Sequence, residues 1–271
     1  MQSLGIIAGK GIYPQLLLEG ARVAGVGRIV IAAFEGETSP ELVKQADVAE
    51  WMRVGQLGRM ISFFKQQNIE QVIMAGQITP KNLFDLRPDL KAILLLARVK
   101  RRNAETLFGA IGDELEKNEI KLLPATHYME QHLAPAGHIA GPKAGRSVLR
   151  DISFGWPLVK QISALDIGQT MVVKQGTVLA VEGFDGTNST IQRGGELGHG
   201  GAVVLKVSKP NQDFRFDVPV IGPDTICVAT AAKVSTIVCE AKKTLLLGLK
   251  ELRDLADAQG VTVLGYEDVQ S

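Results

Sequence analysis

The chain has 271 residues, of which 45% are hydrophobic and 22% charged, and this composition excludes a disordered protein. Lys and Arg number 30 and Asp and Glu 29, so the net charge of +1 argues against bulk electrostatic binding of nucleic acid. A chain of this length is expected to form one large domain or two smaller ones.

The sequence carries no signature of export or of a disulfide framework. Its two cysteines, Cys227 and Cys239, form no Cys-x-x-Cys pair, and the four histidines have no metal-ligand spacing. No signal peptide and no apolar stretch long enough to span a membrane are recognised. We therefore expect two reduced thiols and a cytoplasmic protein.

The first half of the chain alternates short apolar runs with segments of helical spacing. The expected strands are Leu4–Ala8, Arg28–Phe34, Gln71–Ala75 and Lys121–Ala125, and the expected helices are Pro14–Ala24, Gly58–Gln67, Pro88–Arg98 and Ala104–Lys117. Buried strands separated by helices indicate βαβ units and a parallel sheet. Residues 1–132 are therefore predicted to form an N-terminal Rossmann-like domain.

Residues 133–147 are dense in Gly, Pro and Ala and lack a hydrophobic period, so they are predicted to be a linker. Residues 148–271 have more hairpin character and predict a mixed α/β C-terminal catalytic domain. The expected elements are a helix over Leu149–Leu165 that bends or breaks at Pro157, strands over Thr170–Lys174, Thr177–Val181, Ala202–Ser208 and Phe214–Val220, a helix over Thr225–Ala232 capped by Asp224, a strand over Ser235–Glu240, a helix over Leu246–Gln259 and a strand over Val261–Tyr266.

Glycines follow two of the expected parallel strands. Gly9 and Gly11 come after the first strand, and Gly76 comes after the strand Gln71–Ala75. Backbone N–H groups and the dipole of a following helix can form an anion site at such a point. Pro14 stands where a dinucleotide fingerprint would have its third glycine, so a plain tight turn remains the alternative.

The turn Glu182–Thr187 places two carboxylates, Glu182 and Asp185, directly after an expected strand. Such carboxylates suit a hard cation such as Mg²⁺, and the alternative is an ordinary solvated turn.

The densest polar segment is Lys209–Gly222. If its strand forms, Asp213, Arg215 and Asp217 share one face, because side chains alternate along a strand. Lys209 and Arg215 suit phosphate recognition, and Asp217 suits a metal ligand or a group that positions water. The alternative is a charged surface strand.

The stretch Lys91–Arg102 combines a run of aliphatic residues with Arg98, Lys100, Arg101 and Arg102. It is either a buried helix with a solvated basic end or a helix beside acyl chains or anionic headgroups.

Taken together, four motifs resemble those of the LpxI-type UDP-2,3-diacylglucosamine pyrophosphatases of lipid A biosynthesis. They are the opening Leu4–Gly11 with Pro14, Ala75-Gly76 with Pro80, Leu165–Gln169, and the segment Lys209–Gly222 with Thr225 behind it. The resemblance covers nearly the whole chain. It implies a two-domain enzyme that uses a divalent cation to hydrolyse a lipid-linked UDP-sugar to UMP and 2,3-diacylglucosamine 1-phosphate, with the lipid product held between the two halves.

The resemblance implies an essential aspartate at Asp217, which we expect to act with Arg215 in catalysis. The remaining candidates are assigned by class: substrate binding to Gly9, Gly11, Gly76, Lys209, Gln212 and Thr225, and ligation of Mg²⁺ or Mn²⁺ to Asp217, Asp213, Glu182 and Asp185. Peripheral contact with the inner membrane and a homo-oligomer are compatible with this interpretation.

Two other function classes stay open from the residues alone. One is a nicotinamide-dependent oxidoreductase that uses the Gly9/Gly11 turn with Glu35 as the ribose-binding acid. The other is a protein that binds a nucleotide sugar or lipid without catalysis.

Overall fold

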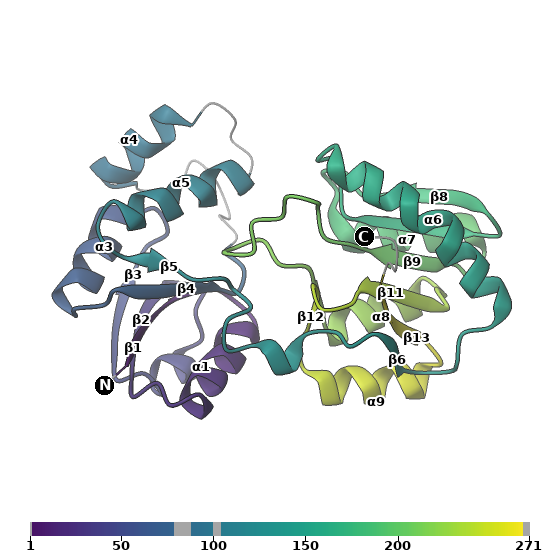
Figure 1. The fold of residues 1–271 in the computed structure, drawn as a ribbon, viewed down its shortest axis with the longest axis horizontal. Helices are drawn as coiled ribbons and strands as arrows, with labels where there is room; N and C mark the ends of the chain where they lie inside the picture. The colour runs from purple at the N-terminus through teal and green to yellow at the C-terminus, as the bar shows by residue number, and fades with distance from the viewer. Residues whose placement is uncertain (1, 79–87, 100–103, 268–271) are drawn as a thin grey trace. The chain divides into compact units, whose positions relative to one another are not determined.

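A computed structural model describes residues 2–78, 88–99 and 104–267, and the chain folds into two compact units (Figure 1). The first unit holds Met1–Glu130 and Asp213–Asp217, and the second holds Gln131–Gln212 and Val218–Ser271. A short segment of the second half of the sequence therefore belongs to the first unit. Among the described residues, no helix has the length and apolar character needed to cross a bilayer.

The first unit is built on a five-stranded parallel sheet with the order β3-β2-β1-β4-β5. Its elements are β1 (Ser3–Ala8), α1 (Tyr13–Val23), β2 (Arg28–Phe34), α2 (Pro40–Val43), β3 (Val48–Met52), α3 (Leu57–Gln66), β4 (Gln71–Ala75), α4 (Leu90–Arg98), α5 (Ala104–Glu116) and β5 (Lys121–Leu122). The strands that follow β1 are added first on one side of it, as β2 and β3, and then on the other side, as β4 and β5, so the strand order reverses between β1 and β4. In open α/β sheets the ligand crevice lies at this point, outside the carboxyl ends of the strands.

Helices cover both faces of this sheet, with α1 on one side and α3, α4 and α5 on the other (Figure 1). The core on the second side joins strand residues such as Val30, Ala32 and Val72 to Phe64 of α3 and Leu115 of α5. These side chains are fully or almost fully buried. The apolar runs seen in the sequence are thus explained by burial of strands on both faces.

The second unit has a six-stranded mixed sheet with the order β6-β13-β11-β9-β7-β8, in which β9, β11 and β13 are parallel. Its elements are β6 (Gly137–Ala140), α6 (Arg146–Ala164), β7 (Thr170–Lys174), β8 (Thr177–Val181), α7 (Gly186–Gly198), β9 (Val203–Lys206), β10 (Val220–Ile221), α8 (Pro223–Ala231), β11 (Thr236–Glu240), β12 (Leu245–Leu246), α9 (Leu249–Gln259) and β13 (Thr262–Tyr266); the 3₁₀ turn η1 (Glu130–His132) precedes them, and β10 pairs only with β12.

Alternating residues of this sheet enter two different cores. Val172 and Val204 face the side covered by α7, α8 and α9, whereas Val173 and Val203 face α6 and its Trp156. This alternation is the period of two expected of strands. The predicted fold class, an α/β protein with a parallel N-terminal sheet and a mixed C-terminal sheet, is confirmed.

Two predicted segments have a different structure. Residues 133–147, expected to be a linker, contain β6, which pairs antiparallel with β13, and the four residues of that strand are too few to show a hydrophobic period. The strand expected over Phe214–Val220 is absent from the structure, which has turns up to Phe216 and only the two-residue β10 at Val220–Ile221. Asp213, Arg215 and Asp217 therefore do not share a strand face.

Candidate functional site

The glycine loops that follow β1 and β4 lie side by side. Gly9 donates its N–H to the carbonyl of Ala75 at 2.8 Å, and Lys10 and Gln77 exchange backbone hydrogen bonds of 2.7 and 3.3 Å. A Cβ atom on Gly9 would lie 2.3 Å from the carbonyl oxygen of Gln77, so no larger residue fits there. Gly76 has φ +86° and is equally close to the other loop. Sequence reasoning placed both glycines correctly at one sheet edge, and close backbone packing accounts for them.

Gly11 differs from its neighbours because it has φ +89° and, among the described residues, no atom lies within 4 Å of a Cβ built on it. Glycine is required at position 11 because of the backbone conformation alone, and the open space beside it leaves room for a ligand. Gly11 is thus the member of the loop that best suits substrate contact.

We expect Gly9→Ala and Gly11→Ala to have different effects on folding. Gly9→Ala forces the two loops apart and should lower the free energy of unfolding by about 3 kcal/mol or more, since a backbone atom must move. Gly11→Ala meets only the conformational cost of a left-handed residue, about 1–2 kcal/mol. Urea unfolding of both variants measures this difference. Equal stability of the wild type and Gly9→Ala would contradict the packing role.

The turn Asp213–Asp217 packs against α5 within the first unit. The backbone carbonyl of Phe214 accepts the N–H of Ala125 at 2.7 Å, and the ring of Phe216 lies 5.9 Å from that of Phe108. Gly109 and Gly112 of α5 face this turn, and a Cβ on Gly112 would be 3.4 Å from Nη1 of Arg215. Small residues on the helix therefore let the turn approach closely.

The same turn is connected to the first glycine loop through Ala125. The buried Tyr13, at the start of α1, donates its hydroxyl to the carbonyl of Ala125. Burial raises the pKa of Tyr13 well above its usual value, so the phenol stays protonated and remains a donor. The end of β1, the start of α1 and the turn Asp213–Asp217 thus form one continuous region of the first unit.

Arg215 is held by carboxylates on two sides. Its Nε and Nη2 donate to Asp213 at 3.0 and 2.8 Å, and its Nη1 donates to Glu116 at 3.2 Å. The hydrogen bonds from Arg215 lower the pKa of Asp213, and the same pair raises the pKa of Arg215. The guanidinium is fixed in orientation and remains charged at every pH of interest.

Asp217 is half-buried at the end of this turn. Its N–H donates to the carbonyl of Asp213 at 3.0 Å, which places the two acids one helical turn apart along the backbone. Arg215 thus pairs with Asp213, a contact that the sequence analysis did not predict.

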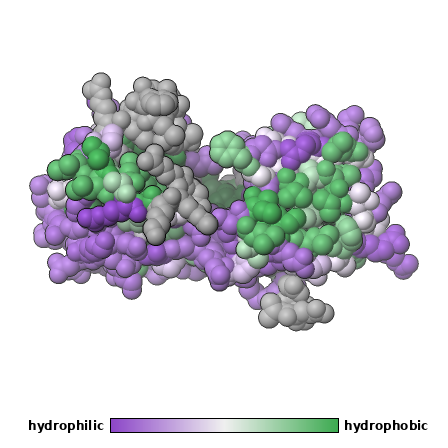
Figure 2. Space-filling model, turned by 90° about the horizontal axis from the view of Figure 1, so that it is seen from above, coloured by the Kyte–Doolittle hydropathy of each residue, from purple (hydrophilic) through white to green (hydrophobic). Residues whose placement is uncertain are grey.

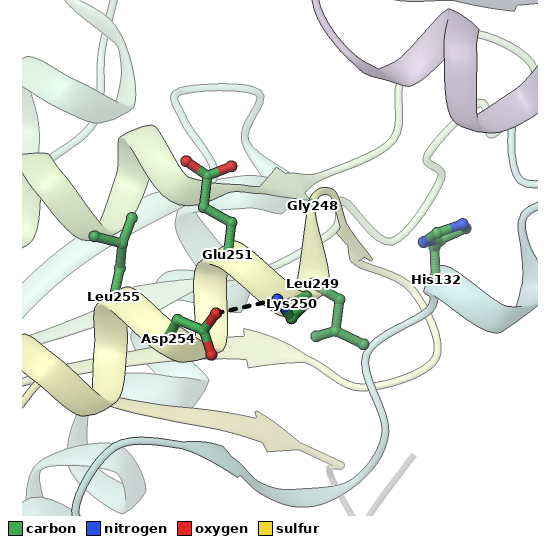
Figure 3. A pocket seen from close by; sticks show the side chains of 7 residues that line it. All are labelled: His132, Gly248, Leu249, Lys250, Glu251, Asp254 and Leu255. Carbon is green, nitrogen blue, oxygen red and sulfur yellow. Dashed lines mark ion pairs between the residues drawn. The ribbon is translucent and has the colours of Figure 1, made fainter.

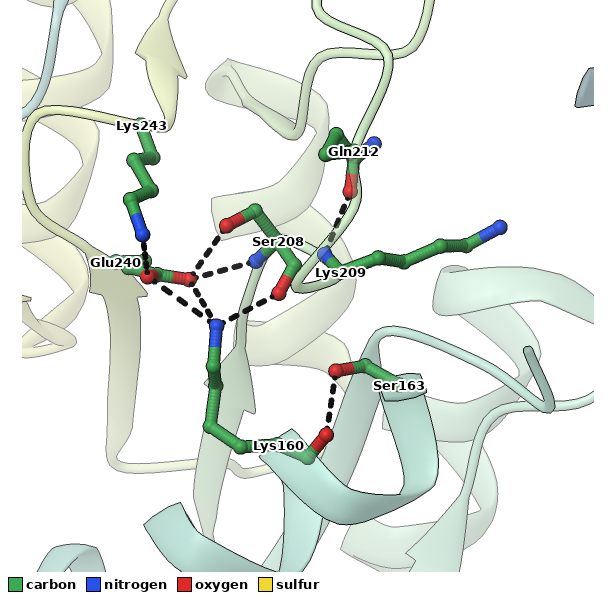
Figure 4. A network of polar contacts seen from close by, with 7 residues as sticks. All are labelled: Lys160, Ser163, Ser208, Lys209, Gln212, Glu240 and Lys243. Carbon is green, nitrogen blue, oxygen red and sulfur yellow. Dashed lines mark hydrogen bonds and ion pairs between the residues drawn. The ribbon is translucent and has the colours of Figure 1, made fainter. Parts of the chain in front are cut away.

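In the second unit, polar groups collect at the sheet edge where β8, β9 and β11 end and β7 begins; we call it the carboxyl edge of the second sheet. Figure 4 shows its centre, the carboxylate of Glu240 at the end of β11. It accepts from the backbone N–H and hydroxyl of Ser208 at 2.8 and 2.7 Å, from Lys160 of α6 at 3.0 Å and from Lys243 at 2.8 Å.

Burial alone would raise the pKa of Glu240, but the hydrogen bonds from Lys243, Ser208 and Lys160 outweigh it and hold the pKa below its usual range. The side chain is therefore ionised at neutral pH. No local pattern in the sequence signals this network, because its members come from α6, the segment after β9, and β11 with the turn that follows it.

Lys209 and Gln212 continue this edge beyond Ser208. Gln212 is buried, and its side-chain oxygen accepts the backbone N–H of Lys209 at 2.6 Å, which closes the turn between them (Figure 4). The ammonium of Lys209 forms an ion pair with Asp166. Gln212 thus has a positioning role for Lys209, whereas Lys209 carries the charge that suits a phosphate.

Glu182 and Asp185 lie at the same edge, after β8. Glu182 accepts the N–H of Gln169 at 3.1 Å and the hydroxyl of Thr187 at 2.8 Å. Asp185 pairs with Arg193, which lowers the pKa of Asp185. Both carboxylates therefore already have hydrogen-bond donors from the chain.

Thr225 lies in the first turn of α8, where its hydroxyl accepts the N–H of Gly222 at 3.4 Å and its own N–H donates to the carbonyl of Gly222 at 3.0 Å. The helix cap is Gly222, not the predicted Asp224. This contact explains Thr225 by helix capping.

The predicted metal ligands do not make a ready ligand set. Asp213 and Asp217 belong to the first unit, and Glu182 and Asp185 to the second. Within the described ranges, no three side chains of His, Cys, Asp or Glu are grouped as a metal site would require. Arg215 and Arg193 also occupy two of the four carboxylates. These residues do not by themselves fit a cation bound by the protein alone.

A hollow of about 610 Å³ lies at the start of α9, and none of its lining residues is one predicted for the site (Figure 3). Its lining is His132, Gly248, Leu249, Lys250, Glu251, Asp254 and Leu255. Lys250 and Asp254 pair across one helical turn at 3.9 Å. The hollow is open, and neither of the two polar networks described above extends into it.

Comparison with known proteins gives matches over almost the whole chain. Residues 3–132 match the family model described as LpxI N-terminal domain, and residues 135–264 match that described as LpxI C-terminal domain. A curated relative from Caulobacter vibrioides, named UDP-2,3-diacylglucosamine pyrophosphatase LpxI, is 30% identical over 98% of this chain and 98% of its own length.

Two solved structures show a remote likeness to the chain. The biotin carboxylase domain of a Hydrogenobacter thermophilus 2-oxoglutarate carboxylase is 15% identical with a TM-score of 0.28, over 65% of this chain and 35% of that one. N5-carboxyaminoimidazole ribonucleotide synthetase from Thermotoga maritima is 12% identical with a TM-score of 0.24, over 69% and 42%. Structural similarity at this level indicates nothing about the function of the chain.

Proposed function

The chain belongs to the LpxI family, and on this premise we propose that it hydrolyses the pyrophosphate bond of UDP-2,3-diacylglucosamine in lipid A biosynthesis. The products are UMP and 2,3-diacylglucosamine 1-phosphate. The observation that carries the proposal is the match to both family domains, in order, together with a relative of that name over the full length.

The chemistry requires water to attack one phosphorus while charge builds up on the oxygens around it. Fixed positive groups that lower the energy of that charge are the main means of catalysis in such reactions. Arg215 is orientated in advance by Asp213, and its second partner, Glu116, is half exposed. An exposed ion pair is weak, so a phosphate oxygen can replace Glu116 on Nη1.

Lys209 is our second candidate for the pyrophosphate. Its side chain is 16% exposed and pairs with Asp166, whose own side chain is 48% exposed. A phosphate dianion can compete for that ammonium, while Gln212 keeps the backbone of Lys209 in place. Both cations are thus held by acids that water already reaches.

We also propose a requirement for Mg²⁺ or Mn²⁺, with Asp217 as its carboxylate. Mg²⁺ is commonly bound by one or two carboxylates, with substrate phosphates and waters completing its octahedron. A metal site that is completed only by the substrate is therefore consistent with the incomplete ligand set that the protein residues make by themselves. The bound cation would polarise the phosphoryl oxygens.

We further propose that the enzyme acts in the cytoplasm at the inner face of the membrane. Both cysteines are free thiols, as in a reducing compartment, and the proposed substrate is a lipid.

Release of UMP from UDP-2,3-diacylglucosamine by the purified full chain tests the proposal. We expect turnover with Mg²⁺ and a loss of at least about 100-fold when a chelator removes it, because the cation neutralises the developing charge. Re-addition of Mg²⁺ or Mn²⁺ should restore the rate. Tight binding of the substrate without release of UMP, with either metal present, would favour a binding protein instead.

A further inference from the structure

The helix α4 has a fixed orientation on the first unit. Its Ala92 and Leu95 are buried in the core with α3 and α5. Asp89, the helix cap, accepts the N–H of Ala92 at 2.9 Å and that of Gly58 in α3 at 2.6 Å. Lys91 pairs with Glu114 of α5 at 2.9 Å. Contacts to two neighbouring helices therefore determine which face of α4 points outward.

That outward face is apolar. Leu90 is 72% exposed, Leu94 51% and Ile93 48%, and Ala97 is exposed beside them. These positions follow the i, i+3, i+4, i+7 spacing of one helical stripe. Figure 2 shows the hydrophobic atoms gathered where Figure 1 places α4. Water-exposed stripes of this kind commonly mark an interaction surface.

The charged side chains of α4 itself are positive, and the neighbouring acids Asp89 and Glu114 serve as the helix cap and as the partner of Lys91. No acidic residue occurs between Leu90 and Ala104, whereas Lys91 and Arg98 lie on α4 and Arg98 is exposed. The next basic residues in the sequence, Lys100, Arg101 and Arg102, lie outside the described residues. An apolar face that ends at the exposed Arg98, on a helix with no acidic residue of its own, suits the headgroup boundary of an anionic bilayer.

We propose that the stripe Leu90, Ile93, Leu94 and Ala97 is a docking surface for an anionic lipid bilayer, with α4 lying in the plane of the interface. The apolar side chains enter the acyl boundary, and Arg98 stays at the phosphates. A second copy of the chain is the other occupant that such a stripe can take, and the experiment below distinguishes the two. Binding of the bilayer through this surface involves no catalytic step.

Sedimentation of the full chain with lipid vesicles tests this surface. Vesicles that contain about 30% phosphatidylglycerol should retain the protein, vesicles of phosphatidylcholine alone should retain much less, and 0.5 M NaCl should release part of it, since salt screens the charges. Ile93→Asp and Leu94→Asp should each lower the partition coefficient by about tenfold or more, because a buried aliphatic side chain is lost.

Val23→Asp is the matched control: Val23 is 90% exposed at the end of α1, in the same unit, and binding should not change. Leu95→Asp would not test this surface, because Leu95 is buried in the core and its replacement would unfold the unit. Equal losses for Val23→Asp and Leu94→Asp would overturn the proposal. The proposal would also be overturned if the wild-type protein did not bind anionic vesicles, whether or not Leu94→Asp alters the oligomeric state.

Discussion

Replacing Asp217 by Asn should lower kcat for UMP release by about 10²–10⁴-fold and leave the melting temperature close to that of the wild type. The substitution keeps the size of the side chain and removes its charge. The backbone hydrogen bond from Asp217 to Asp213 is unaffected, so the turn should persist. Substrate binding should also persist, because Lys209 and Arg215 remain.

The matched control is Asp213→Asn, the same substitution one turn earlier in the same segment. Asp213 holds Arg215 through Nε and Nη2, so its loss should lower the melting temperature and raise KM. The pair of variants separates a charge used in the reaction from a charge used to orientate Arg215. Near-wild-type kcat in Asp217→Asn would contradict the catalytic role of Asp217.

Strands bounded by clear turn signals were predictable to the residue. Thr170–Lys174 and Thr177–Val181 form β7 and β8 as expected, because Gln175 and Gly176, which connect them, both adopt positive φ angles. Positive φ at both positions is the requirement of a tight hairpin turn. Short-range chemistry was sufficient in this case.

Elements whose pattern depends on distant neighbours were missed. The helix α7 is rich in glycine, and Gly194 and Gly195 would each collide with a neighbour if they carried a Cβ, at 2.4 Å from Val172 and 2.2 Å from the carbonyl oxygen of Ala232. In the sequence these glycines favour a turn. Close packing on β7 and α8 reverses that preference.

The segment Lys209–Gly222 was predicted with the wrong backbone structure. Alternating Phe214, Phe216 and Val218 look like a strand, whereas Phe216 packs against the core of the first unit from within a turn. The period of two cannot reveal that Asp213–Asp217 belong to a different unit from their flanking residues. Long-range topology therefore limited the site prediction more than residue chemistry did.

Glu240→Gln should have the largest effect on stability, lowering the free energy of unfolding by about 3–5 kcal/mol at neutral pH. The carboxylate is 10% exposed and accepts hydrogen bonds from Lys160, Lys243 and Ser208. An amide cannot balance the ammonium of Lys160, which is 25% exposed, and one of its atoms would turn a donor toward existing donors.

Lys243→Met serves as the control, since Lys243 contacts the same carboxylate but is 48% exposed. An ion pair so exposed contributes about 1 kcal/mol or less, so the loss should be small. Urea unfolding at pH 7 compares the two variants. Losses of equal size would indicate that exposure does not determine the strength of these contacts.

The effect of Glu240→Gln should depend on pH in a defined direction. Because the folded protein lowers the pKa of Glu240, its stabilisation is fully present above the usual value of 4.5 and disappears as the pH falls through the lowered pKa. The difference in unfolding free energy between wild type and variant should therefore be constant from pH 6 to 8 and should shrink at acid pH, below about pH 4. A difference that stays the same down to about pH 3 would show that the charge of Glu240 is not what stabilises the carboxyl edge of the second sheet.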